Sequence, residues 1–211
     1  LGYIFNLLGI PKSTLSSWFK GLELSEGSKQ RIYNDWKSRL GASRGNAVKW
    51  HNEQKAIRIM LAETGARTAL DRIPEDSVDI EELALAMLYL GEWGKKDSGT
   101  LMGNSDPLIL RFFISMLVNV YGVPVDKIKA YLHLRTDQNA VQLKRYWATT
   151  LGLQTKNFVG TYYDQRTAGR PTYPSYKGVC LIQCGRIDIQ RRLVSLSKMY
   201  SDRVIQKYMG A

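Results

Sequence analysis

A carboxylate that follows a long apolar run has the clearest chemical potential in this sequence. Residues 81–90 read EELALAMLYL, and Gly91 and Glu92 come directly after them. The run predicts a buried helix, and an isolated buried charge costs several kcal/mol unless it is paired or ligates a cation. We therefore expect Glu92 to bind a divalent metal.

The residues around Glu92 also resemble a known motif. Residues 85–93, LAMLYLGEW, are similar to the motif of the LAGLIDADG homing endonucleases, with Glu92 in the place of its last acid. In that family, paired motif helices bring two acids to metal ions that activate water for phosphodiester hydrolysis. The resemblance implies that Glu92 is the catalytic residue and a metal ligand. It also implies that the main-chain carbonyl of Gly91 is a second ligand and that Mg²⁺ is the ion.

The number of motif copies in the chain bears on its oligomeric state. Residues 85–93 are its one occurrence in 211 residues, and a cut through both DNA strands needs two such carboxylates. The resemblance therefore implies a homodimer that cleaves double-stranded DNA.

Three positions depart from the family pattern. Met87 stands where a small residue is common, Leu90 replaces the first acid, and Trp93 replaces the last glycine. These departures favour an alternative, a LAGLIDADG-like transcriptional regulator that binds DNA without cleaving it. An ordinary core helix and an RNA-binding or structural protein are further alternatives.

The residues after the motif predict the elements that would position it. Alternating and β-branched stretches predict strands at residues 100–104, 128–135, 158–163 and 179–184, and helical periodicity predicts helices at residues 107–121, 137–151 and 188–206. Residues 78–211 are therefore expected to form an α+β domain, and the resemblance implies an antiparallel sheet that lies in the major groove.

Polar positions of these strands and their loops supply candidate DNA contacts, although each also fits an ordinary solvent-facing residue. The candidates are Lys127, Lys129, His133, Arg135, Arg166, Arg170, Lys177 and Gln183. We expect residues 165–177, which are rich in tyrosine and basic side chains, to form a flexible loop that contacts DNA.

The N-terminus predicts a second DNA-binding element. Apolar residues at helical spacing on both sides of Gly9 indicate two short helices, with Ser13 as the expected N-cap of the second and with Trp18 and Phe19 in the core. Residues 8–18 are similar to the turn and recognition helix of resolvase- and transposase-type domains, although an ordinary helical hairpin is the alternative. The resemblance implies a helix-turn-helix in residues 1–22 whose DNA contacts come from Lys12, Ser13, Thr14, Ser16, Ser17 and Lys20.

Residues 23–77 are expected to form a helical, basic connector. Gly41 and Gly45 are expected to interrupt its helix, and residues 72–77, with a proline at position 74, are the expected domain boundary. Its basic residues either follow a DNA backbone or form a solvated helix face. They are Arg39, Arg44, Lys49, Lys55 and Arg58.

Charge and composition limit the classes of protein that fit. The chain carries 30 Lys and Arg against 19 Asp and Glu, a net charge of +11, with 44% hydrophobic residues. This composition excludes collagen-like, coiled-coil and wholly disordered chains. Residues 75–94 have six acidic and no basic residues, whereas the segments before and after them carry net charges of +6 and +11. A polyanion such as nucleic acid is the expected partner.

Other classes are excluded by missing patterns. No apolar run approaches the length of a membrane span, so no membrane partner is expected, and no phosphate-binding glycine loop, catalytic triad or HExxH pattern occurs. Cys180 and Cys184, the two cysteines, lie two strand steps apart on one predicted face. We expect them to be small core residues and the protein to be intracellular.

Overall fold

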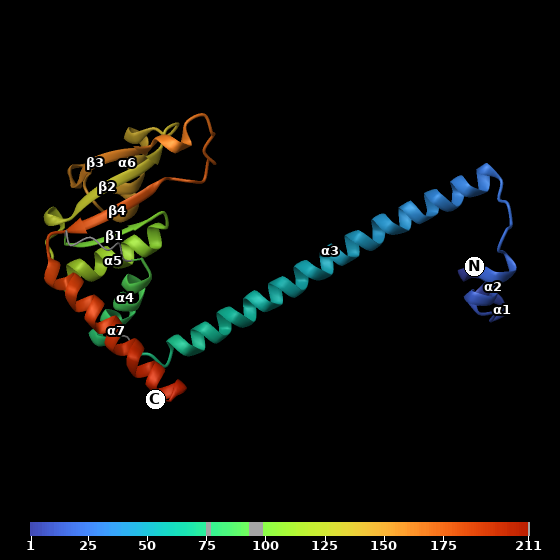
Figure 1. The fold of residues 1–211 in the computed structure, drawn as a ribbon, viewed down its shortest axis with the longest axis horizontal. Helices are drawn as coiled ribbons and strands as arrows, with labels where there is room; N and C mark the ends of the chain where they lie inside the picture. The colour runs from blue at the N-terminus through green and yellow to red at the C-terminus, as the bar shows by residue number, and fades with distance from the viewer. Residues whose placement is uncertain (75–76, 93–98, 211) are drawn as a thin grey trace. The chain divides into compact units, whose positions relative to one another are not determined.

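The computed structural model describes residues 1–74, 77–92 and 99–210, without the side chains of residues 39 and 41–44. The chain divides into two compact units, Leu1–Pro74 and Glu75–Ala211. The division falls inside the stretch, residues 72–77, that is expected as a linker. Figure 1 shows the elements of each unit along the chain.

Unit 1 begins with two short helices. Helix α1 (Gly2–Leu8) ends at Gly9, whose φ of 69° is the left-handed conformation that glycine adopts without strain. Helix α2 (Lys12–Trp18) has Pro11 as its N-cap, so the expectation of Ser13 as the cap is wrong. Proline has a fixed φ and no N–H group, and the helix can therefore start directly after it.

The core of these two helices is smaller than expected. Leu15 is their one buried apolar residue in the described structure, whereas Trp18 is 65% exposed and Phe19 is 43% exposed. The prediction that Trp18 and Phe19 are core residues is therefore wrong. Two helices of seven residues each have too little facing surface to enclose large aromatic rings.

Helix α3 (Glu26–Leu70) is continuous over 45 residues. The expected interruption at Gly41 and Gly45 is not found, because an isolated glycine costs a helix only about 1 kcal/mol relative to alanine. Ser25 is the N-cap, and its side chain accepts a hydrogen bond from the Ser28 backbone.

Unit 2 has the α+β organisation that the sequence predicts. Its helices are α4 (Val78–Glu92), α5 (Pro107–Asn119), α6 (Ala140–Leu151) and α7 (Ile187–Met209). Its strands are β1 (Thr100–Asn104), β2 (Lys129–Arg135), β3 (Phe158–Asp164) and β4 (Val179–Cys184). Short 3-10 helices occur at Val125–Lys127 (η1), Thr155–Asn157 (η2) and Gln165–Thr167 (η3).

The sheet differs from the expected one in a single strand pair. The strand order is β1-β4-β2-β3, and β4 pairs antiparallel with both of its neighbours. β2 and β3 are parallel, so the expectation of a wholly antiparallel sheet is wrong. The connection between them crosses over through α6, and such a crossover returns the chain in the same direction.

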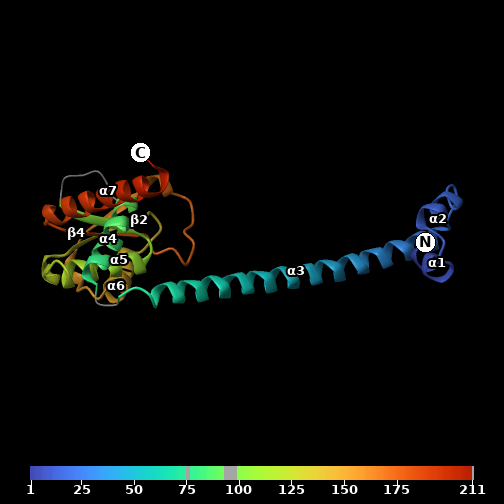
Figure 2. The ribbon, with the colours of Figure 1, turned by 90° about the horizontal axis from the view of Figure 1, so that it is seen from below.

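The two faces of the sheet have different surroundings. One face is covered by α4, α5, α6 and α7 (Figures 1 and 2). Each strand contributes buried side chains to this face, among them Met102, Leu132, Phe158 and Ile182. The alternate positions point to the other face, which no helix of unit 2 covers in the described structure. This second face is called the open face below.

An ion pair between a buried carboxylate and an exposed guanidinium joins α4 to α7. Glu82 of α4 is 5% exposed, and its Oε2 accepts a hydrogen bond of 2.7 Å from Nη2 of Arg192 of α7. Tyr121, just after α5, donates its hydroxyl to Oε1 at 2.7 Å. The hydrogen bond from Arg192 holds the pKa of Glu82 below its ordinary value, while burial raises the pKa of Tyr121 and keeps it a neutral donor.

This ion pair makes a testable contribution to stability. Glu82→Gln removes the charge from a group with two partners, and we expect the free energy of unfolding to fall by about 1–3 kcal/mol at neutral pH. Because the folded-state pKa of Glu82 is lowered, its contribution is present above the ordinary value of 4.5 and is lost as the pH falls through the lowered value.

The measurement is urea unfolding of the wild type and the variant from pH 7 to pH 3. Glu81→Gln, at an exposed neighbour on the same helix, serves as the control and should change the free energy by about 0.5 kcal/mol at most. A difference between the wild type and Glu82→Gln that stays constant over this pH range would contradict the assignment.

Candidate nucleic-acid interface

β2 is the centre of the open face. Its side chains alternate between buried and outward positions, so Lys129, Tyr131, His133 and Arg135 all point to the open face. Lys129 and His133 are exposed, and Arg135 is half-buried. The structure thus brings three of the predicted DNA-contacting residues together in one row.

Aromatic rings extend this row onto β3. His133 lies beside Tyr162 in the strand register, and their ring centroids are 5.1 Å apart at an interplanar angle of 33°. The Tyr131 ring also stacks with Tyr162, with centroids 6.3 Å apart and an angle of 28°. His133, Tyr162 and Tyr131 are called the aromatic row below.

Gly160 makes room for the aromatic row. It lies beside Tyr131 in the strand register, and a Cβ atom placed on it would lie 3.0 Å from Cδ1 of that ring. A side chain at this position would crowd the ring. The absence of one therefore lets Tyr131 lie over β3 and reach Tyr162.

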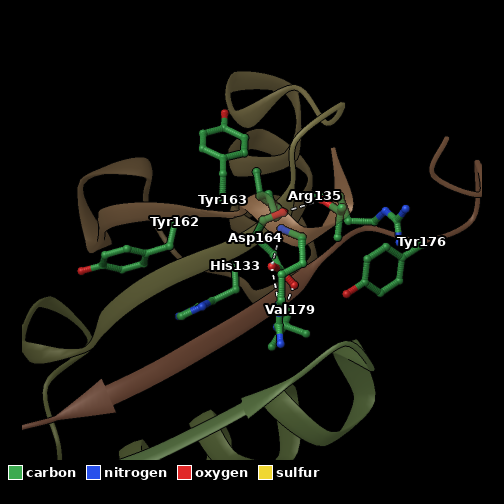
Figure 3. A pocket seen from close by; sticks show the side chains of 10 residues that line it. His133, Arg135, Tyr162, Tyr163, Asp164, Tyr176 and Val179 are labelled. Atoms are coloured by element: carbon green, nitrogen blue, oxygen red, sulfur yellow. Dashed lines mark hydrogen bonds and ion pairs between the residues drawn. The ribbon is translucent and has the colours of Figure 1, made fainter. Parts of the chain in front are cut away.

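A cavity of about 530 Å³ opens next to the aromatic row, where β2 and β3 end and β4 begins. Figure 3 shows His133 and Tyr162 on one side of it and Tyr176 on the other. Arg135, Asp164 and further residues of both strand ends complete its lining. The cavity thus combines flat rings with charged groups.

The charged groups of the cavity are held in place. Arg166 donates two hydrogen bonds to the carboxylate of Asp164, from Nε at 2.8 Å and from Nη2 at 2.9 Å. These bonds hold the pKa of Asp164 below its ordinary value. Arg135 donates from Nη2 to the Arg170 carbonyl at 3.0 Å, and its Nε is buried without a hydrogen-bond partner in the described structure.

The loop of residues 165–178, which forms one side of the cavity, is tied down by hydrogen bonds. Three side chains from the β2–α6 turn and from α6 bind it, and its two ends are fixed by Thr167 and Gly178. The bonded pairs are Asp137 with Thr172 (2.6 and 2.7 Å), Gln138 with the Tyr176 carbonyl (2.9 Å) and Trp147 with the Lys177 carbonyl (2.9 Å). These bonds restrain the loop, and its expected flexibility and contact with DNA stay predictions.

Gly178 fixes the point where this loop enters β4. Its φ is 76°, and a Cβ atom there would lie 2.5 Å from the Leu134 side chain and 2.9 Å from the His133 carbonyl. The position therefore requires glycine. Any other residue would place its Cβ against β2, and its backbone would be strained at this positive φ.

The other predicted sheet-domain residues are more scattered. Gln183 points to the open face from β4, beside Lys129 in the register, and Lys127 lies exposed in η1 just before β2. Arg170 is exposed in the loop. Lys177 is turned away from the open face, because its ammonium donates to the Pro174 carbonyl at 2.8 Å and lies 5.9 Å from the ring of Tyr146 on α6.

The predicted contacts of unit 1 all lie on or just after α2. Lys12, Ser13, Ser16, Ser17 and Lys20 are exposed and Thr14 is half-buried, so all but Thr14 are fully accessible to a partner. The Nζ atom of Lys12 lies 5.5 Å from the centroid of the Phe5 ring. Of the connector residues, Lys49, Lys55 and Arg58 are exposed, and the side chains of Arg39 and Arg44 lie outside the described structure.

The structure corrects the reasoning on Glu92. Glu92 is the last residue of α4 and is exposed, as is Gly91, so the prediction of a buried carboxylate at this position is wrong. Glu92 lies one turn after Tyr89 on the face of α4 that packs into the core. The core ends before it, so no other element of the described structure buries its side chain. The buried carboxylate of α4 is Glu82, and it is neutralised by Arg192 rather than by a metal.

The described residues of one chain do not form a complete divalent-cation site. No group of three or more His, Cys, Asp or Glu side chains that could hold a metal occurs among residues 1–74, 77–92 and 99–210. Glu92 supplies one carboxylate and Gly91 one carbonyl, and residues 93–98, with Trp93, lie outside the described structure. The expectation of Mg²⁺ at this position therefore stays a prediction, and we assign no reaction step to it.

The aromatic row is the part of the site that sequence reasoning missed. Tyr131 is two residues from both Lys129 and His133 on the same strand, so the alternation of β2 could have placed it on the open face. Tyr162 could not be placed, because an extra β3 residue at the register shift between Ala130 and Tyr131 changes which β3 positions face outward.

Comparison with protein-family models, curated proteins and solved structures gives no match for this chain. In the part of the chain that the structure describes, none of the helices is long and apolar enough to span a bilayer.

The anchoring of the loop can be tested at Gln138. This side chain accepts a hydrogen bond from the Arg135 backbone and donates one to the Tyr176 carbonyl, so Gln138→Ala removes both ties. We expect faster amide hydrogen exchange in residues 168–178, by about fivefold for each kcal/mol of local stability lost, without an equal change elsewhere in unit 2. Gln142→Ala, at an exposed position of α6, is the control. Equal exchange in both variants would contradict the anchoring role.

Proposed function

We propose that the protein binds double-stranded DNA and that the open face of its sheet is the principal contact surface. The observation that carries this proposal is the row of outward-facing Lys129, His133 and Arg135 on β2, on a sheet face that the helices of unit 2 leave uncovered. Lys129 and Arg135 provide cationic donors, and His133 a polar ring, at strand spacing to phosphates and base edges in a groove.

The distribution of charge supports a polyanionic partner. Lys129 and His133 have no acidic partner in the described part of the chain, so their interaction with a phosphate would not require an existing ion pair to break. The chain as a whole carries a net charge of +11. Binding would release the counterions condensed on DNA, which favours association at low salt.

Unit 1 supports sequence-specific recognition as a second part of the proposal. The exposed small and basic side chains of α2 are the types that reach base edges and phosphates in a helix-turn-helix, and the left-handed Gly9 ends α1 three residues before α2 begins.

The surface of α4 supports a homodimer. Ile80, Met87 and Leu90 are 37–39% exposed and, with the half-buried Leu83, follow the spacing of three and four residues by which paired helices pack. The opposite face of α4 packs into the core of unit 2. We propose that a second copy of the chain covers this stripe, as the motif of residues 85–93 implies.

Metal-dependent cleavage of DNA is the second candidate function. The exposed carboxylate of Glu92, at the last residue of the helix that carries the motif, is the observation that favours it. The competing candidate is a LAGLIDADG-like regulator that binds an operator without cleaving it.

An intracellular location is also proposed, since Cys180 and Cys184 are free and buried.

The DNA-binding proposal can be tested with Lys129. We expect Lys129→Gln to weaken binding of duplex DNA and to reduce the slope of log affinity against log salt by about 1, because one phosphate contact is lost. Fluorescence anisotropy of a labelled duplex at several salt concentrations measures both quantities. Lys198→Gln, an exposed position on α7 at the other side of the sheet, is the matched control. If both variants bind with the wild-type salt slope, the open face is not the DNA-binding surface.

Cleavage is tested separately from binding. The wild type and Glu92→Gln are incubated with Mg²⁺ and a library of genomic duplex fragments, and the products are sequenced. A nuclease should cut in the wild type and lose at least about a hundredfold in rate in the variant, since the acid holds the metal. A regulator should bind one site with equal affinity in both proteins, with or without Mg²⁺, and should leave the DNA uncut.

A further inference from the structure

We infer that the cavity beside the aromatic row holds one unpaired nucleotide of the bound DNA, with its base stacked on Tyr162. This inference rests on the proposed DNA binding and adds the form of nucleic acid that the open face prefers. Three properties of the cavity carry it, namely its ring geometry, its polar groups and its size.

The ring geometry provides a stacking surface. Tyr162 is 55% exposed although the rings of His133 and Tyr131, both on the neighbouring strand β2, lie next to it. The two neighbours limit the movement of the Tyr162 side chain, and Gly160 keeps the space that Tyr131 needs. An accessible ring that is already ordered loses little conformational freedom when a base stacks on it.

The polar groups of the cavity match a nucleotide. Arg135 lines the cavity with a cationic side chain, and its Nη2 is fixed by the bond to the Arg170 carbonyl. The Arg166 side chain is 90% exposed at the rim and is oriented by Asp164. Its remaining N–H groups are accessible to a phosphate.

The size and composition of the cavity also fit a nucleotide. A volume of about 530 Å³ lies in the range of small-ligand sites, which is roughly 300–1,000 Å³. Tyr176, from the anchored loop, lies on the opposite side of the opening from His133 and Tyr162 (Figure 3). The site therefore offers aromatic groups on both of its sides.

The nucleotide must be unpaired for a geometric reason. In an intact duplex each base is stacked on its neighbours, so its flat face is not available to a protein ring. A base reaches the Tyr162 ring only when it has left the stack or lies in a single strand. Fully paired DNA can contact Lys129 and the outer part of the face without filling the cavity.

The experiment compares three DNA probes of one sequence: a fully paired duplex, the same duplex with one bulged 2-aminopurine, and the single strand that carries the 2-aminopurine. Binding is measured by anisotropy, and stacking by quenching of 2-aminopurine fluorescence. The proteins are the wild type, Tyr162→Ala, Tyr162→Phe and the control Tyr208→Ala, at a 74% exposed tyrosine on α7. Circular dichroism checks that each variant is folded.

We expect the wild type to bind a probe with an unpaired nucleotide more tightly than the paired duplex and to quench its fluorescence. Tyr162→Ala should lose about 5- to 150-fold in affinity for that probe and lose the quenching, while it keeps wild-type affinity for the paired duplex. Tyr162→Phe and Tyr208→Ala should behave as the wild type. A preference for the bulged duplex over the single strand identifies an extruded base, and the reverse identifies a single-stranded segment.

Gly160→Val is a second variant that keeps all three rings. The added side chain should displace Tyr131 and reduce binding of the unpaired probe without changing the affinity for the paired duplex. Equal binding of paired and unpaired probes by the wild type and all variants would overturn the inference but leave the proposed DNA binding in place. If the wild type binds none of the three probes, both are overturned.

Discussion

Strand β2 is hydrogen-bonded on both sides, to β3 and to β4, and this constrains each of its side chains to one of two directions. Ala130, Leu132 and Leu134 point to the helices and are fully or nearly fully buried. A shift of the register by one residue would put the basic side chains into the core, where an unpaired charge is costly, and would expose the leucines to water. The composition of the open face is therefore a consequence of the hydrophobic core behind it.

Two further interactions keep the open face in its present form. The side chains of Gln138 and Trp147 hold the loop that borders the cavity, and Gly160 leaves the space in which the aromatic row assembles. On the other side of the sheet, Glu82 and Arg192 join α4 to α7. The helices on one side of the sheet and the loop at its edge thus stabilise the open face on the other side.

Much of the fold of unit 2 could be predicted from the sequence. The strands expected at residues 179–184 and 100–104 match the bounds of β4 and β1. The parallel pairing of β2 with β3 could not be predicted, because periodicity describes each strand alone and carries no information about its partner. The direction of pairing depends on the path of α6 across the sheet.

The candidate site was predictable only in part, for similar reasons. Lys129, His133 and Arg135 could be assigned to one face from β2 alone, whereas Tyr162 joined them through the irregular register with β3. The burial of Glu82 and the exposure of Glu92 depend on where α4 leaves the core, and both acids lie on the same helical face. The spacing of apolar residues therefore indicates which face of α4 packs into the core. It does not indicate at which residue of α4 that packing ends.

The fixed ends of the loop between β3 and β4 have a consequence for how related chains can diverge. Thr167 is hydrogen-bonded to the β2–α6 turn, and Gly178 enters β4 against β2, so both ends are held independently of what lies between them. Insertions, deletions and substitutions in the middle of the loop would leave the sheet unchanged. This segment is therefore the part of unit 2 where ligand preference can evolve with the least effect on folding.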